Sequence, residues 1–382
     1  MSKRFILCET TYFGAGCRGE LTGEISRRKL KKALIVTDME LIKHGITDKV
    51  LDSIGATPYA VFSAVKANPT VNNVKEGLET FKKIKADFII AVGGGSVIDA
   101  AKAIAIIAAN PEYSDVISLA GVVSTKNRCI PIIALPTTAG TAAEVTINYV
   151  ITDEARQVKM VCVDPNALPI LSIIDAELMI TMPKDLTAAT GVDALTHAIE
   201  GYITKGAWEM SDMFELKAIE LIAQSLREAA NNSSDIVARE KMALAQYIAG
   251  MGFSNVGLGA VHSMAHPLGG HFDIAHGVAN ALLLPVVMEF NLPACEQKYA
   301  KIAVAMGQKI DGLNAKDAAV MAVSAVKKLS IDLGIPQTLH EIGVSKSDLP
   351  KLAKDAYNDI CTGGNPRDIT EKDILTLYKK AY

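Results

Sequence analysis

The sequence predicts an α/β domain built on a mostly parallel β-sheet, followed by an all-helical domain. Through the first half of the chain, short apolar runs alternate with helical patterns, the order expected for a parallel sheet covered by helices on both sides. Beyond Pro183, strand-like runs are nearly absent, and Ala, Leu, Met, Glu and Lys recur at helical spacing. A length of 382 residues leaves room for two substantial cores. We therefore expect one domain over residues 1–183 and a second over 184–382.

Four apolar runs bounded by turn signals are the expected strands of this sheet, and they read as strands buried on both faces: 32–38, 86–92, 129–135 and 171–175. Residues 69–85 and 97–110 follow a helical pattern between them. The segment 145–165 interrupts the alternation and predicts a β-hairpin near the end of the first domain.

Composition excludes several classes of protein. Hydrophobic residues make up 49% of the chain, charged residues 21%, and the net charge is −3, values typical of a soluble globular protein. There is no basic face of the kind that binds nucleic acid, and no uninterrupted apolar run is long enough to span a membrane. The N-terminal segment lacks the apolar core of a signal peptide. The six cysteines are scattered without a CxxC pair, which favours reduced thiols and a cytoplasmic location.

The second half carries the residues of a metal site: Asp193, His197, His262 and His276. Asp193 and His197 are four residues apart in a segment that reads as helix, so their side chains project from one face. His262 and His266 repeat that spacing. Five of the seven histidines fall within residues 197–276, which favours a shared site over unrelated polar residues. Neutral imidazoles and a carboxylate suit a divalent ion such as Fe²⁺ or Zn²⁺.

Not all five histidines can be ligands. His271 would face away from His266 if the helix continued, and Pro267 with the following glycines predicts that the helix ends there. The glycines of 250–260 follow a helical stretch instead of a strand, so we expect them to permit close helix packing or a bend near the metal.

A glycine-rich turn joins strand 86–92 to the helix over 97–110. Gly94, Gly95 and Ser96 would let the backbone approach a diphosphate, and the helix N-terminus behind them offers free N–H groups. The alternative is a tight turn in which Ser96 is the N-cap and Asp99 completes a capping box. The same turn can be capped in this way and also bind a diphosphate.

Two more loops strengthen the nucleotide interpretation. Asp38 ends strand 32–38, where a carboxylate can accept hydrogen bonds from ribose hydroxyls. Strand 129–135 is followed by Thr137, Thr138 and Thr141, whose hydroxyls either bind the ligand or only form local turn bonds. Loops at the carboxyl ends of parallel strands meet at one edge of the sheet. The first domain is therefore predicted to be a Rossmann-like, dinucleotide-binding domain.

With both sets of residues in hand, the chain resembles the iron-dependent alcohol dehydrogenases over essentially its whole length. The segments that carry the resemblance are VGGGSVIDAAKAI, PTTAGTAAEVTINYVITDE, ATGVDALTHAIEGYI, GMGFSNVGLG, HSMAHPLGG, HGVANALLLP and CTGGNPR. It implies that Asp193, His197, His262 and His276 hold the metal, and it favours iron over zinc. It also implies homodimers paired through the N-terminal strand region. NAD contacts are implied for Asp38, Asn68, Gly95, Ser96, Thr137, Thr138, Thr141, Val150, Lys159 and Leu178.

The resemblance implies reversible hydride transfer between NAD(H) and a small alcohol or aldehyde, with His266 near the nicotinamide. His266 is the candidate proton relay, because histidine ordinarily exchanges protons near neutral pH; the alternative is a helix-face histidine bonded to backbone. No Lys or Arg occurs between Lys241 and Lys298, so the pocket suits a neutral substrate. The candidate pocket residues are Phe253 as a wall, Asn148 as a partner for a second hydroxyl, and Cys361 at the rim or as a packing residue.

Within that family the expected reaction is reduction of lactaldehyde to 1,2-propanediol, and 1,3-propanediol, ethanol and butanol are the alternative alcohols. A lyase of the dehydroquinate synthase type shares the architecture, but its anionic substrate needs a cation-rich pocket. A metal- or dinucleotide-sensing regulator would need an output surface, which the sequence does not show. His271 departs from the family pattern, in which an aromatic or aliphatic residue is more usual, and we expect it to face solvent.

Overall fold

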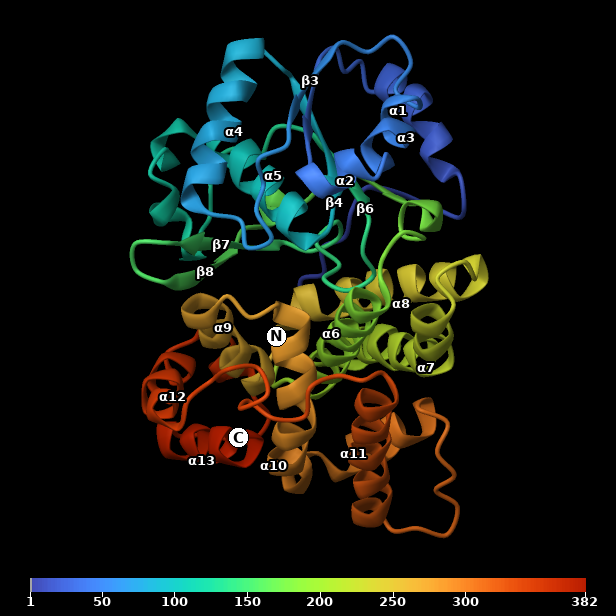
Figure 1. Ribbon diagram of the computed structural model, residues 1–382, viewed down its shortest axis with the longest axis vertical. Coiled ribbons are helices and arrows are strands. Elements are labelled where there is room, and N and C mark those ends of the chain that lie inside the picture. The colour runs from blue at the N-terminus through green and yellow to red at the C-terminus, as the bar shows by residue number, and fades with distance from the viewer. Residues whose placement is uncertain (1) are drawn as a thin grey trace. The chain divides into compact units, whose positions relative to one another are not determined.

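The computed structural model describes residues 2–382, which form two compact units. Unit 1 comprises the chain up to Thr138 together with Ala142–Thr181. Unit 2 comprises the short segment Ala139–Thr141 and Met182–Tyr382. Figure 1 shows the strands in the blue and green part of the chain, whereas the yellow to red part is helical.

Unit 1 is built on a six-stranded sheet with the order β1-β9-β6-β4-β2-β3, and every neighbouring pair is parallel. Its strands are β1 (Thr10–Phe13), β2 (Ala33–Val36), β3 (Tyr59–Phe62), β4 (Phe88–Gly93), β6 (Ile132–Pro136) and β9 (Leu171–Ile174). The expected parallel sheet is confirmed, and each of the four expected strands is present with bounds shifted by a few residues. The edge strands β1 and β3 were not expected, because they are short and partly exposed.

Alternate residues of the central strands pack on opposite faces of this sheet, as the period of a strand requires. Leu34 and Ile89 belong to the core that includes residues of α4 (Val71–Ile84) and α5 (Gly95–Ala109). Ile35 and Ile90 belong to the core on the other face, which includes residues of α1 (Leu21–Arg27) and α3 (Ile46–Leu51). Both faces are covered, which explains why these strands read as continuous apolar runs.

A smaller sheet completes unit 1. Strand β7 (Asn148–Asp153) pairs antiparallel with β8 (Val158–Val163), which confirms the expected hairpin, and β5 (Gly121–Val122) pairs parallel with β8. The remaining elements of unit 1 are α2 (Met39–Lys43), η1 (Cys17–Glu20), η2 (Pro111–Tyr113), η3 (Val116–Leu119), η4 (Pro165–Ala167) and η5 (Ala176–Leu178).

Unit 2 contains no strand among the residues that the structure describes. Its helices are α6 (Lys184–Ile203), α7 (Glu209–Asn231), α8 (Ile236–Val256), α9 (Ala260–Phe272), α10 (His276–Ala305), α11 (Ala315–Asp332), α12 (Leu349–Tyr357) and α13 (Glu371–Ala381), with the short turns η6 (Lys346–Asp348) and η7 (Ile360–Gly364). Helix α10 packs against α11, α6 and α9, and α6 against α7 and α8. Buried side chains of α6 and α10 therefore meet in the interior of this unit.

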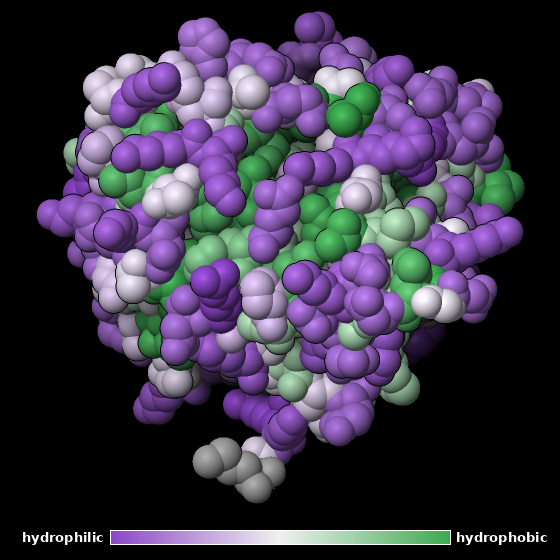
Figure 2. All heavy atoms as spheres, turned by 90° about the horizontal axis from the view of Figure 1, so that it is seen from below, coloured by the Kyte–Doolittle hydropathy of each residue, from purple (hydrophilic) through white to green (hydrophobic). Residues whose placement is uncertain are grey.

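Helix α10 is long and apolar enough to cross a membrane by length and composition alone, a segment that the sequence analysis did not expect. Burial accounts for its apolar character, because 61% of its most apolar window lies inside the structure. Exposed apolar residues also occur on unit 2, among them Val304 and Ile331. Figure 2 shows a face on which apolar residues lie between hydrophilic ones. We interpret α10 as a core helix.

Helix α9 does not end at Pro267, as the sequence analysis expected, but continues to Phe272. A proline inside a helix removes one backbone hydrogen bond and strains the preceding turn. Here the helix is buried from Ala260 to Gly269 and packs against α10 and α12, and these contacts maintain it past the proline. His271 is therefore helical.

Candidate functional site

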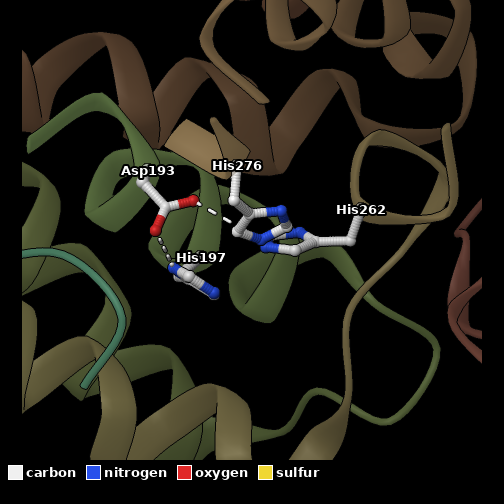
Figure 3. A group of neighbouring side chains, drawn as sticks. All are labelled: Asp193, His197, His262 and His276. Carbon is white, nitrogen blue, oxygen red and sulfur yellow. Dashed lines mark ion pairs between the residues drawn. The ribbon is translucent and has the colours of Figure 1, made fainter. Parts of the chain in front are cut away.

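Four side chains from three helices converge on one point in unit 2 (Figure 3). Asp193 and His197 project from α6, His262 from α9, and His276 is the first residue of α10. One ligand atom from each lies within 4.8 Å of the others. Asp193 Oδ2 is 3.8 Å from His197 Nδ1, and Asp193 Oδ1 is 3.8 Å from His276 Nε2. The structure thus assembles all four residues that the spacing pointed to.

The amide nitrogen of Asn280 faces three polar atoms of this group. The Asn280 amide nitrogen lies 2.7 Å from Asp193 Oδ1, 3.1 Å from His276 Nε2 and 3.3 Å from His262 Nε2. An amide nitrogen carries two protons, so it cannot donate to all three acceptors. A divalent cation would satisfy them together, and three imidazoles with a carboxylate are a donor set that Fe²⁺ and Zn²⁺ accept.

Burial keeps the imidazoles in the form that a metal requires. Burial lowers the pKa of His197 and that of His262 to about 3, so both rings are neutral at physiological pH. A metal ligand must be deprotonated at its coordinating atom. The two ring centroids lie 4.4 Å apart, and protonating both would place two charges in one buried pocket.

Glu200 on α6 was not expected, and it positions His262. Its Oε2 lies 2.7 Å from His262 Nδ1, which leaves Nε2 directed at the other ligands. Its carboxylate also accepts the N–H groups of Gly259, Val261 and His262, the start of α9. Burial raises the pKa of Glu200 to about 7, against the effect of those hydrogen bonds. In many metalloproteins one ring nitrogen of a histidine binds the metal while the other donates a hydrogen bond to a carboxylate.

Two glycines of 250–260, where the sequence analysis expected close helix packing, make room for buried carboxyl groups. A Cβ at Gly259 would lie 2.9 Å from Glu200 Oε1, and one at Gly252 would lie 2.2 Å from Glu215 Oε1. A larger residue at Gly259 would push Glu200 off the start of α9. These glycines permit close packing next to the metal ligands.

His266 lies one turn from His262 and faces the same cluster. Its ring stacks on that of His276 with centroids 5.5 Å apart, and its Nδ1 lies 2.7 Å from Asp359 Oδ2. Burial acts to raise the pKa of Asp359, but the His266 ring and the hydrogen bonds outweigh it and hold that pKa below its usual range. The ionised carboxylate accepts the Nδ1 proton, so Nε2 of His266 is the atom left to exchange a proton. The alternative, in which the His266 side chain bonds to backbone, is wrong because its Nδ1 contacts the Asp359 carboxylate.

The three expected pocket residues have different surroundings. Phe253 on α8 is buried and stacks on His197, with ring centroids 4.3 Å apart. Cys361 in η7 is half-buried next to Asp359, whose Oδ1 accepts the Cys361 N–H at 2.8 Å. Asn148, in unit 1, begins β7 and is half-buried. Its carbonyl accepts a hydrogen bond from the buried ammonium of Lys102 at 2.7 Å, which fixes the backbone at that point.

The glycine-rich turn and the threonine loop adjoin each other at the carboxyl ends of β4 and β6. Thr137 N–H donates to Gly93 O at 3.1 Å, and a Cβ at Gly94 would lie 3.2 Å from the Thr138 side chain. Helix α5 begins at Gly95, and its N-cap, Gly94, has no side chain to occupy the first-turn N–H groups. The capping box offered as the alternative does not form, because the N-cap is Gly94 and not Ser96. Ser96 Oγ instead donates to Ala67 O, and Asp99 accepts the Val150 N–H at 2.9 Å.

The strand order reverses between β2 and β4, since β3 flanks β2 on one side and β6 flanks β4 on the other. Open α/β sheets bind ligands outside the carboxyl ends of strands at such a point. Asp38 follows β2 there as the N-cap of α2, and its Oδ1 accepts the Leu41 N–H at 2.9 Å. Its other carboxylate oxygen has no part in that bond.

The remaining expected cofactor residues are placed as follows. Lys159 Nζ donates to Asn68 Oδ1 at 2.7 Å, so these two side chains lie together. Val150 is half-buried on β7. Leu178 is buried in the core on one face of the six-stranded sheet. Thr141 lies in the short segment Ala139–Thr141, which is part of unit 2.

His271 does not face solvent as expected. Its Nε2 lies 2.7 Å from Asp355 Oδ2 on α12, and its side chain is only 12% exposed. It belongs to the α9–α12 contact, away from the ligand cluster.

The sequence analysis also missed Glu200, Asn280 and Asp359. Helical spacing could have found the first two, because Glu200 lies seven residues after Asp193 and Asn280 four after His276. Nothing in the sequence next to Asp359 indicates that it contacts His266.

Comparisons with known proteins cover the whole fold. Residues 8–176 match the family described as iron-containing alcohol dehydrogenase, and residues 187–382 match the Fe-containing alcohol dehydrogenase family, C-terminal. The lactaldehyde reductase of Escherichia coli (strain K12) is 54% identical over 384 residues, covering 100% of both chains. A crystal structure of 1,3-propanediol oxidoreductase aligns with a TM-score of 0.97 at 43% identity, covering 100% of both chains. Sulfoacetaldehyde reductase from Bifidobacterium kashiwanohense, in complex with NAD⁺, aligns with a TM-score of 0.89 at 28% identity over 100% of this chain and 99% of that one.

Proposed function

Because the chain belongs to the iron-containing alcohol dehydrogenase family, we propose that it catalyses reversible hydride transfer between NAD(H) and a small neutral alcohol or aldehyde. The proposed pair is lactaldehyde and 1,2-propanediol, supported by 54% identity over the full length to a lactaldehyde reductase. The observation that carries the proposal is the group of Asp193, His197, His262 and His276, whose ligand atoms lie within 4.8 Å of one another and of which only His276 is not buried.

Those four residues would hold the iron. The fit rests on the donor chemistry and on the Asn280 amide, which faces more acceptors than it has protons to offer. A bound ion supplies Lewis acidity that polarises the substrate carbonyl or lowers the pKa of the alcohol. Glu200 and Asn280 hold His262 and Asp193 in place, so the ligands are pre-oriented.

His266 would carry the proton. Asp359 holds its Nδ1 proton at 2.7 Å, which leaves Nε2 to give a proton to the developing alkoxide during reduction and to take one during oxidation. The ring stacks on that of His276, so the exchanging nitrogen is held next to the ligand group.

Unit 1 would bind NAD, with the domain boundary near residue 183. The N-terminus of α5 offers N–H groups and a favourable dipole to the diphosphate, and Thr137 and Thr138 lie next to it. Asp38 has a second carboxylate oxygen for the ribose hydroxyls. A structural relative at 28% identity was solved in complex with NAD⁺. Asn68, Ser96, Val150, Lys159 and Leu178 complete the proposed set in unit 1, and Thr141 is the one proposed contact that belongs to unit 2.

The substrate pocket would be neutral. The chain has no Lys or Arg between Lys241 and Lys298, the stretch that holds His262, His266 and His276. An anionic substrate would need a cation there, so a dehydroquinate-synthase-like lyase is disfavoured. Phe253 would form a wall, Asn148 would bond the second hydroxyl of a diol, and Cys361 would lie at the rim.

One specific observation favours a second substrate. A 1,3-propanediol oxidoreductase shares the fold with a TM-score of 0.97 and 43% identity. 1,3-Propanediol and 1,2-propanediol differ only in the position of the second hydroxyl, so the two activities depend on the same pocket contact. Lactaldehyde is preferred because the lactaldehyde reductase is more nearly identical, at 54%.

We also propose a homodimer in the cytoplasm. Strand β1 lies at one end of the six-stranded sheet, the position from which a sheet can extend into a partner. All six cysteines are free in the part of the chain that the structure describes, which is consistent with a reducing compartment. Sedimentation equilibrium at micromolar concentration tests the dimer.

The experiment is a substrate panel on protein purified anaerobically with Fe²⁺. Lactaldehyde, 3-hydroxypropanal, acetaldehyde and butanal are each reduced with NADH, and metal content is measured in the same preparation. We expect the highest kcat/KM for lactaldehyde with about one iron per chain. A higher kcat/KM for 3-hydroxypropanal would replace the substrate but keep the reaction class, whereas turnover of none of them would contradict the proposal.

Iron can be separated from zinc by oxidation. Peroxide should inactivate an iron enzyme and added Fe²⁺ with reductant should restore it, because Zn²⁺ has no redox state to lose. The cysteines are blocked beforehand so that thiol oxidation does not contribute. Activity that resists peroxide under these conditions would assign zinc.

A further inference from the structure

We propose that His266, Asp359 and Cys361 form a second metal site, separate from the iron ligands and selective for zinc, whose occupation inhibits the enzyme. One ligand atom from each of these residues lies within 4.8 Å of the other two. The set shares no residue with Asp193, His197, His262 and His276. The proposal that zinc binds rests on these contacts alone. The proposal that zinc inhibits the enzyme rests also on the proposed function.

The three donors sit on elements that hold them together. His266 is on α9, Asp359 immediately precedes η7, and Cys361 is inside η7. Thr362 Oγ1 lies 2.8 Å from Ser263 Oγ on α9, and the same hydroxyl donates to Ala356 O at 2.7 Å. These bonds fix η7 against α9 and α12. The donors therefore need only small shifts to reach a common ion.

The site is ordered and largely shielded from solvent. The side chains of His266 and Asp359 are 8% and 11% exposed, and Cys361 is half-buried. His266 Nδ1 and Asp359 Oδ2 are 2.7 Å apart and would separate slightly to accept an ion between them. Three protein ligands leave the fourth position of a tetrahedral zinc ion for one water molecule.

The two ligand sets differ in softness. The first offers nitrogen and oxygen only, whereas the second includes a thiol sulfur. Thiolate ligands favour zinc, and zinc binds such sites more tightly than Fe²⁺ does. The structure thus places a site suited to zinc next to one suited to iron, with the rings of His266 and His276 stacked 5.5 Å apart.

Zinc binding would change the protonation of both His266 and Cys361. The Cys361 S–H bond breaks, an S–Zn bond forms, and that proton leaves to solvent. The proton on His266 Nδ1 gives way to an N–Zn bond, and Nε2 takes up a proton, so the ring stays neutral overall. One proton is released per zinc and no electron moves. His266 can then no longer cycle a proton at Nε2, and the rate of reduction falls.

The test adds Zn²⁺ to the iron-loaded holoenzyme under anaerobic conditions and measures iron and zinc by elemental analysis together with activity. Co²⁺ is added in a parallel titration, because a thiolate ligand gives cobalt a charge-transfer absorption band that N and O ligands do not. The variant is Cys361→Ser. Cys17→Ser, a half-buried thiol in unit 1, is the matched control.

The proposal predicts that one zinc binds per chain while iron is retained, that activity falls in proportion, and that Co²⁺ gives the thiolate band. In Cys361→Ser the band should vanish and zinc affinity should drop by at least about tenfold, whereas Cys17→Ser should behave as the unmodified protein. Iron released one for one with zinc uptake, or equal zinc affinity in Cys361→Ser, would overturn it. The metal contents and the cobalt band are read without a substrate, so they stand even if the proposed reaction is wrong.

Discussion

Glu200 and His262 form a buried pair in which Glu200 Oε2 lies 2.7 Å from His262 Nδ1. The carboxylate therefore sets the ring's tautomer and directs Nε2 toward Asp193 and His276. The same carboxylate accepts backbone N–H groups at the start of α9. A single side chain on α6 thus fixes both the ring and the helix that carries it.

Glu200→Gln should weaken iron binding by about 10–100-fold, the usual cost of losing a partner behind a metal ligand. Glutamine keeps an acceptor for the α9 backbone but can present its NH₂ group to His262, which removes the preference for the Nδ1–H tautomer. Competition with a chelator measures the affinity, and Glu209→Gln, exposed at the start of α7, is the control. Unchanged iron affinity would show that Glu200 serves only the packing of α9.

His266→Ala should retain about one iron per chain, while kcat falls by about 10²–10⁴-fold, the effect of losing a proton-transfer group. Its Nδ1 is bonded to Asp359, and it is not one of the four convergent ligands. Metal analysis and steady-state kinetics on the same sample separate the two roles. If iron is lost together with activity, His266 is a ligand and the proton assignment is wrong.

Asp38 should make the enzyme prefer NAD over NADP by at least roughly two orders of magnitude in kcat/KM, because like charges at a desolvated site commonly cost several kcal/mol. Since Asp38 also caps α2, the sharper variant is Asp38→Asn, which keeps a cap of equal quality and removes only the charge. NADP should then be used more readily. Asp38→Gly, which also loses the cap, gives the comparison. Equal use of both cofactors by the unmodified protein would show that Asp38 does not meet the ribose.

Glu215 on α7 should make the protein less stable at alkaline pH. It is fully buried, and neither carboxyl oxygen has a hydrogen-bond partner among the described residues. Burial, with Asp212 nearby, raises the pKa of Glu215 well above 4.5. A pKa raised in the folded state adds stability that is present below the unfolded value and lost as pH rises through the folded value.

The measurement is the unfolding midpoint of Glu215→Gln across pH 5 to 9, compared with the unmodified protein. Glutamine cannot ionise, so the decline in stability at high pH should be smaller in the variant. Glu228→Gln, exposed on the same helix, should leave the profile unchanged. Parallel profiles for all three proteins would show that Glu215 does not ionise over this range.

Much of this architecture was predictable because the apolar runs of the first half and the helical spacing of the second half are both clear in the sequence. The central strands are buried on both faces, so 86–92 and 171–175 read as apolar runs, and the hairpin pattern was equally clear. Strand β3 was missed because two of its four residues are exposed. The end of α9 was misjudged because a proline opposes a helix locally, and only packing against α10 and α12 overrides it.

The ligand cluster was predictable for a different reason. Pairs of histidine and aspartate at helical spacing are a local signal, and that signal survives without knowledge of the fold. Asp359 gives the contrast: it reaches His266 across 93 residues of chain, so only the packing of α9 against η7 brings the pair together. Ser96 shows the same limit, since its partner is the Ala67 carbonyl, 29 residues away.

The central claim is that Asp193, His197, His262 and His276 hold the catalytic metal apart from the nucleotide-binding residues. The measurement is iron content, NADH binding and turnover of His276→Ala after anaerobic reconstitution with Fe²⁺. His271→Ala is the matched control, because this histidine bonds Asp355 instead of facing the cluster. The account predicts that His276→Ala loses iron and turnover but still binds NADH, while His271→Ala keeps all three. Full turnover by His276→Ala without bound divalent metal would contradict it.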